Sequence, residues 1–286
     1  MNFWRSRTLR WVMTLLTALA LLGSPVHKAA GAVVVGTNTT PAPTTTASWT
    51  FSHTVGAGSD RVLVVATSHR DGNKNVTNIT FNGVTLTQAI QQNGTSSNNQ
   101  VNIWYLVNPT VTTANVVITV SGSVKIAATA INLTGVYQAA PVSSTAGNSG
   151  TSTAPSATVV SASNELVMAA VAANGDALSV ASGGGQISLA NNGTGTGGGD
   201  VRMGVDSETG AASVTTTWTL GASKSWGTAS ASVRPSGAIA LSGKVFEDVN
   251  YGGGAGRDLA TAMANGGAVR PAAYVELYTV SGSTAT

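Results

Sequence analysis

Short runs in which apolar and polar residues alternate make up most of this chain. Alternation over four to eight residues is typical of β-strands with one buried face. It is clearest in Ser213–Leu220, where every second residue from Val214 onward shares one face. The densest β-forming run is Asn99–Val107 (NQVNIWYLV). The pattern therefore predicts an all-β protein with almost no helix.

Strand boundaries can be read from the same pattern. Two runs, Arg61–Ser68 and Glu165–Ala173, are apolar on both faces, as central strands are. Asn82-Gly83 and Asn174-Gly175 are hairpin signals, because both turn positions need a positive φ. Residues 148–155, rich in Ser, Thr and Gly, are interpreted as a linker within the domain. We predict strands over residues 48–55, 61–68, 77–81, 84–90, 101–107, 114–121, 126–133, 165–173, 201–208, 213–220 and 226–234.

About a dozen short strands at this spacing predict an antiparallel, jelly-roll-like β-sandwich. One internal echo suggests a two-sheet, two-half arrangement. Ser59–Ala66 (SDRVLVVA) and Ser163–Ala170 (SNELVMAA) each begin with a polar turn pair that leads into a fully apolar strand. Two core strands could also look alike by chance.

The flanking segments differ in composition from the sandwich. Residues 1–32 have three Arg, a twelve-residue apolar run and the small-residue pattern Ala30-Gly31-Ala32, which together predict a cleaved signal peptide. Residues 33–47 are Thr/Pro-rich and are expected to be an extended or mobile lead-in. The main domain then covers residues 48–235. Residues 236–286 are predicted to form a small, incomplete second β-domain.

Composition excludes several classes of function. Charged residues are 9% of the chain, against ~25% in an average soluble protein. Four of the 14 basic residues lie in the first 32 positions, which leaves ten basic against 11 acidic residues. We therefore expect no nucleic-acid partner and no membrane insertion after signal cleavage. The absence of Cys excludes thiol chemistry and means that the core, not disulfides, holds the fold.

Candidate sites for chemistry are few. Asp206 and Glu208 share a strand face, but a glycosidase needs a matched pair across a cleft, so a solvated strand end is favoured. Ser68-His69-Arg70-Asp71 contains the residue types of a triad, but adjacent strand residues point to opposite faces. His53 is the other histidine outside the first 32 residues. We predict no catalytic residues and no enzymatic activity.

Asn99–Val107 offers a possible binding surface. Val101, Ile103 and Tyr105 share one face, and Asn102 and Trp104 share the other. If the second face is uncovered, Asn102 and Trp104 form a sugar-stacking platform. If it is covered, Trp104 is a core residue, which is the favoured interpretation because large aromatics dominate core burial.

Two segments resemble known families. The runs DRVLVVA at residues 60–66, FNGV at 81–84, IWYLV at 103–107 and the closing ASVRP at 231–235 resemble an uncharacterised β-sandwich module of bacterial exported and cell-surface proteins. Residues 243–280 resemble the start of an SD-repeat B-type (Cna B-like) domain, a stalk module of surface adhesins. That resemblance implies an acidic loop that binds calcium in some members.

In this chain the loop would offer Asp248, Asn250 and Asp258 as calcium ligands. Glycine stands at 252, where the family usually has a third ligand, so a metal-free turn remains the alternative. The sequence thus predicts a non-catalytic, secreted or cell-surface structural or adhesion protein of bacterial type. It would be part of a longer modular protein, with surface glycans or other surface proteins as partners. A carbohydrate-binding module that uses the Trp104 face is the alternative.

Overall fold

Across the described residues the chain is almost entirely β-structure. The computed structural model describes residues 31–71, 73–175, 178–180 and 185–237. Helical structure there is limited to one 3₁₀ turn, η1 (Thr95–Ser97), so the all-β prediction is confirmed. The strands, in chain order, are β1 (Val34–Thr39), β2 (Thr44–Val55), β3 (Val62–Arg70), β4 (Val76–Phe81), β5 (Val84–Thr85), β6 (Thr87–Asn93), β7 (Asn99–Val107), β8 (Thr112–Thr134), β9 (Val142–Ser152), β10 (Ser156–Val160), β11 (Leu166–Asn174), β12 (Leu178–Val180), β13 (Ile187–Gly193), β14 (Val201–Thr209), β15 (Ser213–Leu220) and β16 (Lys224–Val233).

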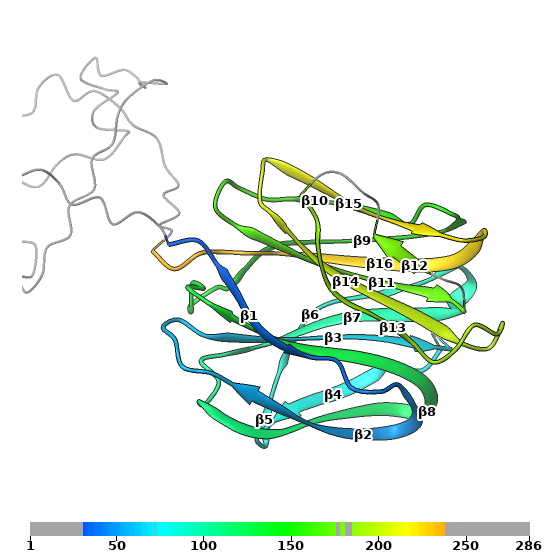
Figure 1. Cartoon of the computed structure of the whole chain (residues 1–286), viewed down its shortest axis with the longest axis horizontal. Helices are drawn as coiled ribbons and strands as arrows, with labels where there is room; N and C mark the ends of the chain where they lie inside the picture. The colour runs from blue at the N-terminus through cyan, green and yellow to red at the C-terminus, as the bar shows by residue number, and fades with distance from the viewer. Residues whose placement is uncertain (1–30, 72, 176–177, 181–184, 238–286) are drawn as a thin grey trace, which may run out of the picture. The chain divides into compact units, whose positions relative to one another are not determined.

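These strands form three antiparallel sheets that stack on one another (Figure 1). The largest has the order β5-β4-β8-β3-β7-β6, with β1 and β2 also paired to β8. A five-stranded sheet has the order β13-β14-β11-β16-β9, and a three-stranded sheet has the order β10-β15-β12. The predicted antiparallel sandwich is therefore present, with more layers than a simple two-sheet sandwich.

The 23-residue strand β8 makes the largest sheet fold back on itself. Its residues up to Val120 pair with β4, whereas its residues from Ile126 on pair with β3. The strand curves back between these two parts, as Figure 1 shows. The sequence predicted two separate strands here, but the backbone continues through the bend. The first half of the molecule thus has an outer layer around β2 and β4 and an inner layer around β3 and β7.

The second half of the molecule repeats this plan strand for strand. In the first half, β3 lies between β7 and β8, β7 pairs with β6, and β8 pairs with β1. In the second half, β11 lies between β14 and β16, β14 pairs with β13, and β16 pairs with β9. The outer layers also correspond, because β8 pairs with β2 and β4 whereas β15 pairs with β10 and β12. The one long strand β8 thus matches two strands, β15 and β16.

Irregularities of the backbone fall at matching places in the two halves. A β-bulge between Gln88 and Ile90 in β6 has its counterpart between Ser188 and Ala190 in β13. The echo in the sequence coincides with this repeat. Asp60 and Asn164, the second residues of the two polar turn pairs, both have a positive φ, of 53° and 71°. The prediction of two related halves is therefore supported by topology, bulges and turn geometry together.

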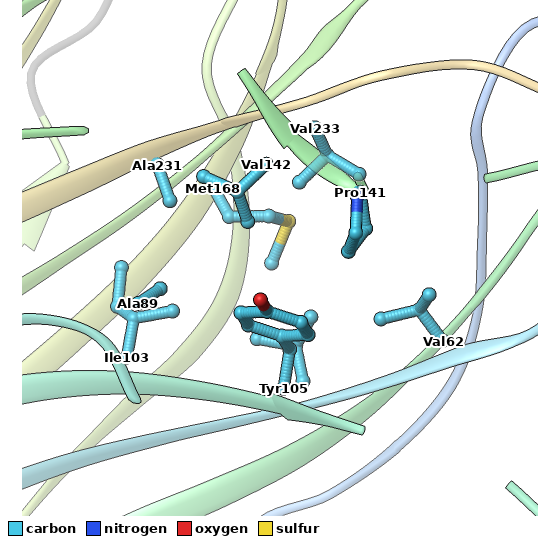
Figure 2. Close-up of a pocket in the computed structure, with 10 residues that line it drawn as sticks. Val62, Ala89, Ile103, Tyr105, Pro141, Val142, Met168, Ala231 and Val233 are labelled. Atoms are coloured by element: carbon cyan, nitrogen blue, oxygen red, sulfur yellow. The ribbon is translucent and has the colours of Figure 1, made fainter. Parts of the chain in front are cut away.

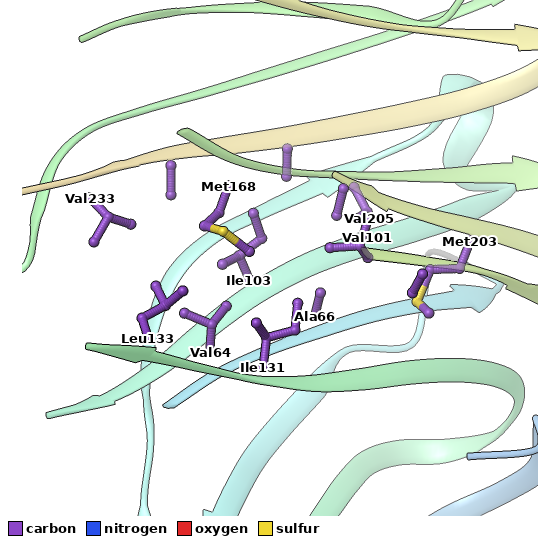
Figure 3. Packing of buried hydrophobic residues seen from close by; sticks show 14 of the residues in the cluster. Val64, Ala66, Val101, Ile103, Ile131, Leu133, Met168, Met203, Val205 and Val233 are labelled. Carbon is purple, nitrogen blue, oxygen red and sulfur yellow. The ribbon is translucent and has the colours of Figure 1, made fainter. Parts of the chain in front are cut away.

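A shared hydrophobic core joins the two inner layers. Side chains from β3, β7 and β8 meet side chains from β11, β14 and β16 in one buried cluster (Figure 3). Each half also has a core of its own, between its inner and its outer layer. Consequently β3 and β11 are buried on both faces, as their apolar sequences predicted. Ala229, Ala231 and Val233 of β16 also lie in the shared core.

The local predictions have mixed outcomes. Much of residues 33–47 is extended, which is one of the two alternatives predicted, but the segment belongs to the body and is not a lead-in, because β1 and the start of β2 pair with β8. Residues 148–152 continue β9 and are not a linker. Asn174-Gly175 is not a hairpin, since β12 pairs with β15 rather than with β11. Asn82-Gly83 does join paired strands, with φ of 48° and 78°.

The chain enters and leaves this body at the same end. After β8, Gly135 donates its N–H to Ser59 O, and Gly135 O accepts from Ser236 N at 2.6 Å. A Cβ on Gly135, whose φ is 70°, would lie 3.0 Å from Ala32 O, so glycine is needed there. Ala32 and Ser236, near the two ends of the described body, therefore both lie beside Gly135.

Truncation of a side chain in the shared core tests this packing. Ile131 is 0% exposed and lies in the cluster between the halves. Ile131→Ala should lower the free energy of unfolding by about 2–5 kcal/mol, through lost burial and the cavity left behind. Val160→Ala is the matched control, because Val160 is 68% exposed and should change stability by less than about 0.5 kcal/mol. Urea denaturation of the full chain measures both, and equal effects would contradict the assignment of the core.

Candidate functional site

The Asn102–Trp104 platform predicted for an uncovered strand face does not exist. Asn102 is 0% exposed and Trp104 is 7% exposed. Trp104 belongs to the cluster between the two layers of the first half, together with Leu63 and Ile118. The favoured interpretation of Trp104 as a core residue is confirmed, and the glycan contact at these two residues is wrong, because no ring face is open to a sugar.

Asn102 belongs instead to a network of side-chain amides. Its Nδ2 donates to Gln100 Oε1 at 3.1 Å, and Gln88 Nε2 donates to its Oδ1 at 3.1 Å. Asn75 Oδ1 accepts from Gln100 at 3.0 Å and from Gln91 at 3.1 Å. These bonds connect β6 and β7 of the inner layer to the start of β4 in the outer layer. The amides thus have a structural role within the first half.

Asp206 is buried, which overturns the interpretation of a solvated strand end. Its side chain is 0% exposed. Its Oδ2 accepts from Gln186 Nε2 at 3.1 Å, and Gln186 also bonds to the backbone N and O of Thr217, both at 3.1 Å. Burial raises the pKa of Asp206 to about 7, partly opposed by hydrogen bonds from polar neighbours, first among them Gln186. Asp206 and Gln186 together tie β14 to β15.

Glu208 shares the face of Asp206, as the spacing predicted, but it is only half-buried. Burial raises its pKa as well. The two carboxylates are neighbours on one strand and do not face each other across a cleft, which is the arrangement a glycosidase requires. Both groups therefore favour their protonated forms more than an exposed carboxylate does.

The repeat shows why Asp206 is unusual. Trp104 pairs with Gln88 beside the bulge in β6, and Asp206 pairs with Ser188 beside the matching bulge in β13. Asp206 thus occupies the position that a core tryptophan fills in the first half. The fold accepts an apolar side chain there, so the buried carboxylate is a feature of the second half alone.

The two histidines outside the first 32 residues are buried and serve the fold. His53 Nδ1 lies 2.9 Å from Thr39 Oγ1, and its Nε2 lies 3.0 Å from Asn132 Oδ1. Because an amide oxygen can only accept, Nε2 carries the proton and Nδ1 accepts from the Thr39 hydroxyl. His69 Nε2 donates to Lys74 O at 2.9 Å. Burial lowers the pKa of both histidines, so both favour the neutral form.

The residues of Ser68–Asp71 do not assemble into a triad, as expected from their adjacency. Ser68 Oγ donates to Val171 O at 3.0 Å, across the shared core. His69 points to the other face, into the first half. Ser68 therefore links the two halves and has no base beside it.

A buried carboxylate that the sequence did not reveal is Glu165. Its Oε2 accepts from the hydroxyls of Ser143, Ser161 and Ser232 at 2.8, 3.2 and 2.7 Å, and from Ala162 N at 3.1 Å. Hydrogen bonds to a carboxylate are stronger than neutral ones. The site ties β9, β16 and the β10–β11 turn together. Sequence reasoning had no signal for it, because the three serines are far apart in the chain.

One pocket lies between the inner layers and is almost filled. Tyr105 points from β7 toward Met168 of β11, as Figure 2 shows. The free volume is about 10 Å³, which is room for about one water molecule. The pocket is therefore a small packing gap and not a ligand site. Its lining residues are Val62, Val64, Ala89, Ile103, Tyr105, Pro141, Val142, Met168, Ala231 and Val233.

A polar groove of about 250 Å³ lies between the turn that follows β3 and the 3₁₀ turn η1, which precedes β7. Only polar and charged residues line it: Arg70, Asp71, Asn73, Ser96, Ser97 and Asn98. The strand β3 starts at the end of the body where Ala32 and Ser236 lie, since Gly135 bonds to Ser59. Nine residues at ~3.3 Å each place the groove about 30 Å from that end. This groove is a candidate binding site among the described residues.

Among the described residues, no group of three or more His, Cys, Asp or Glu side chains could hold a metal ion. The predicted calcium ligands Asp248, Asn250 and Asp258 lie outside those residues, as does the second β-domain from residue 238 on. The calcium site therefore stays a prediction.

The buried carboxylate of Asp206 gives stability a pH dependence. The pKa in the folded protein is raised above 3.8, so this contribution to stability is full below about pH 4 and is lost as the pH rises through about 7. Asp206→Asn removes the titration. The free energy of unfolding of Asp206→Asn minus that of the natural chain should therefore increase by about 2–4 kcal/mol from pH 4 to pH 8.

Urea denaturation of both proteins at the two pH values measures this difference, in which the effects of the shared histidines cancel. Glu208→Gln is the matched control and should show a smaller change with pH, because Glu208 is more exposed. A difference between Asp206→Asn and the natural chain that stays constant with pH would contradict the buried, protonated carboxyl.

Neither a family model, nor a curated protein, nor a solved structure matches this chain. The resemblances of residues 48–235 to a surface β-sandwich module and of residues 243–280 to an SD-repeat B-type domain stay predictions from the sequence.

Proposed function

We propose that this chain is a non-catalytic, exported structural or adhesion module that belongs to a larger surface protein. The observation that carries the proposal is the position of the two ends of the described body. Ala32 and Ser236 both lie beside Gly135, at one end of the body. A module attached in this way is joined to the rest of its protein at one end and leaves the opposite end free for contact.

The internal organisation of the body fits a load-bearing or display role. The two halves share one core, and side chains such as Ser68 bond across it. Buried polar groups that resemble catalytic residues are used to hold strands together, as with Glu165 and His53. Networks of this kind make a body rigid and uniquely packed. Rigidity serves a structural module, whose task is to hold a surface in place.

Features of the sequence support export. Residues 1–32 have the charge, apolar run and small residues of a signal peptide. A fold without Cys suits a chain that is held by its core in any redox compartment. Among the described residues there is no helix with the length and hydropathy that a membrane span requires.

Export and processing of the full chain test the proposal. Expressed in a bacterial host, the chain should leave the cytoplasm and begin at Val33, because cleavage is expected after Ala32. Mass spectrometry of the exported protein measures its N-terminus. Leu16→Arg places a charge in the apolar run and should keep the protein inside the cell with residues 1–32 intact. Retention of the unaltered chain in the cytoplasm, still carrying residues 1–32, would overturn the proposal.

A further inference from the structure

The groove formed by Arg70, Asp71, Asn73 and Ser96–Asn98 has polar groups left over for a ligand. One carboxylate oxygen of Asp71 accepts from Asn73 N at 3.2 Å. Among the described residues, the other oxygen makes no hydrogen bond, and the same holds for the hydroxyls of Ser96 and Ser97. The groove thus offers acceptors, donors and hydroxyls side by side over a short distance.

The walls of the groove are held in place by both halves of the molecule. Arg70 Nη1 donates to Asn98 O and, at 3.0 Å, to Asn174 Oδ1 of β11. The Asn174 side chain also accepts from Asn99 at 2.9 Å, and Ser225 Oγ of β16 donates to Thr95 O at 3.0 Å. A binding site fixed by surrounding hydrogen bonds loses little entropy when its ligand arrives.

The backbone of the groove is also unusual. Asp71, Ser96 and Ser97 have φ of 71°, 57° and 52°. Non-glycine residues rarely adopt such values, and serine has no special tolerance for them. Gly175, at the corresponding position after β11, has no positive φ, and glycine is needed there because a Cβ would clash with Gly197 O. Asp71, Ser96 and Ser97 thus keep side chains where glycine would suit the backbone better.

We propose that this groove binds a neutral sugar residue of a glycan. A carboxylate beside amides, hydroxyls and a guanidinium can accept from and donate to adjacent hydroxyl groups of one ring. The charges of Arg70 and Asp71 balance, and residues 31–237 have seven basic and seven acidic residues, so nothing selects an anionic polymer. The groove has room for a single small ring, and it lies about 30 Å from the end of the body that contains Ala32 and Ser236.

This inference rests on the proposed adhesive role and names its partner. The groove is rich in hydrogen-bonding groups and has no aromatic stacking surface among its lining residues. Binding of one sugar unit is therefore expected to be weak, and useful contact would come from several copies on a surface. Because one copy is expected to bind weakly, the test presents many copies of the chain together.

The test is a glycan array probed with the fluorescently labelled full chain, clustered on beads, and followed by calorimetry with the oligosaccharides that bind. The array carries neutral gluco-, manno- and galacto-oligosaccharides beside sialylated ones. The natural chain should bind neutral members. Asp71→Asn keeps the shape, the Asn73 contact and the tolerance of a positive φ, yet should weaken binding about tenfold or more, because a hydrogen bond to a charged acceptor is lost.

Ser97→Gly is a second variant, which removes a hydroxyl at a position where glycine relieves the backbone. It should weaken binding without lowering the melting temperature. Asp60→Asn is the matched control, because Asp60 also has a positive φ but lies near Gly135, at the opposite end of β3. Its binding should equal that of the natural chain.

Absence of binding to neutral glycans would overturn the inference, and so would binding that Asp71→Asn leaves unchanged. Binding restricted to sialylated glycans, or binding that needs added calcium, would also contradict it. An exported and folded chain that binds no sugar overturns this inference alone. A chain that stays in the cytoplasm overturns the proposed function, so the two failures can be told apart.

Discussion

Burial of both faces of the inner strands is the constraint on which this structure depends. Residues 62–69 of β3 and 167–173 of β11 are all buried, although each strand passes between two different cores. Burial of a large aliphatic side chain contributes about 1.5–3 kcal/mol, so these strands contribute heavily to stability. The cost is that a polar residue on either face must find a partner inside the protein.

Many of the polar contacts follow from that requirement. Ser68 faces the shared core and bonds to the backbone of the other half. His69 faces the core of the first half, where its Nε2 donates to a carbonyl of the next turn. Glu165, at the start of β11, gathers three serines around one oxygen. Residues that look chemical in the sequence thus become structural once both faces are covered.

Comparison of the two halves separates what the fold needs from what it tolerates. At matched positions beside a β-bulge, the first half has Trp104 and the second half has Asp206. The end of β3 shows the opposite difference, because Arg70 and Asp71 stand where the second half has Asn174 and Gly175. In the second half a Cβ at Gly175 would clash with Gly197 O, whereas the first half has a side chain at Asp71, beside the groove.

The sequence was a good guide to local structure and a poor guide to layers. Alternation correctly placed the faces of Asn99–Val107 and of Ser213–Leu220, because the period of a strand is a local property. Alternation could not show that β8 bends through two layers. It also could not show that β1 pairs with β8, because the Thr/Pro composition of residues 33–47 also suits a flexible segment.

The sites were predicted least well. Burial of Trp104 and Asp206 depends on which layer lies above them, and the groove joins loops that are about 25 residues apart in the chain. Neither property has a local signature. The similar turns at Asp60 and Asn164 were visible in the sequence. The matching strand order was needed to show that they belong to a repeat of the whole half.

Hydrogen–deuterium exchange of the full chain, followed by mass spectrometry, tests the doubled architecture most directly. If the two halves share one core and unfold as a unit, amides of β3 and β11 should exchange most slowly and at closely similar rates. If β11 exchanges much faster than β3, with rates close to those of exposed turns, the second half opens independently and the account of a shared core is contradicted.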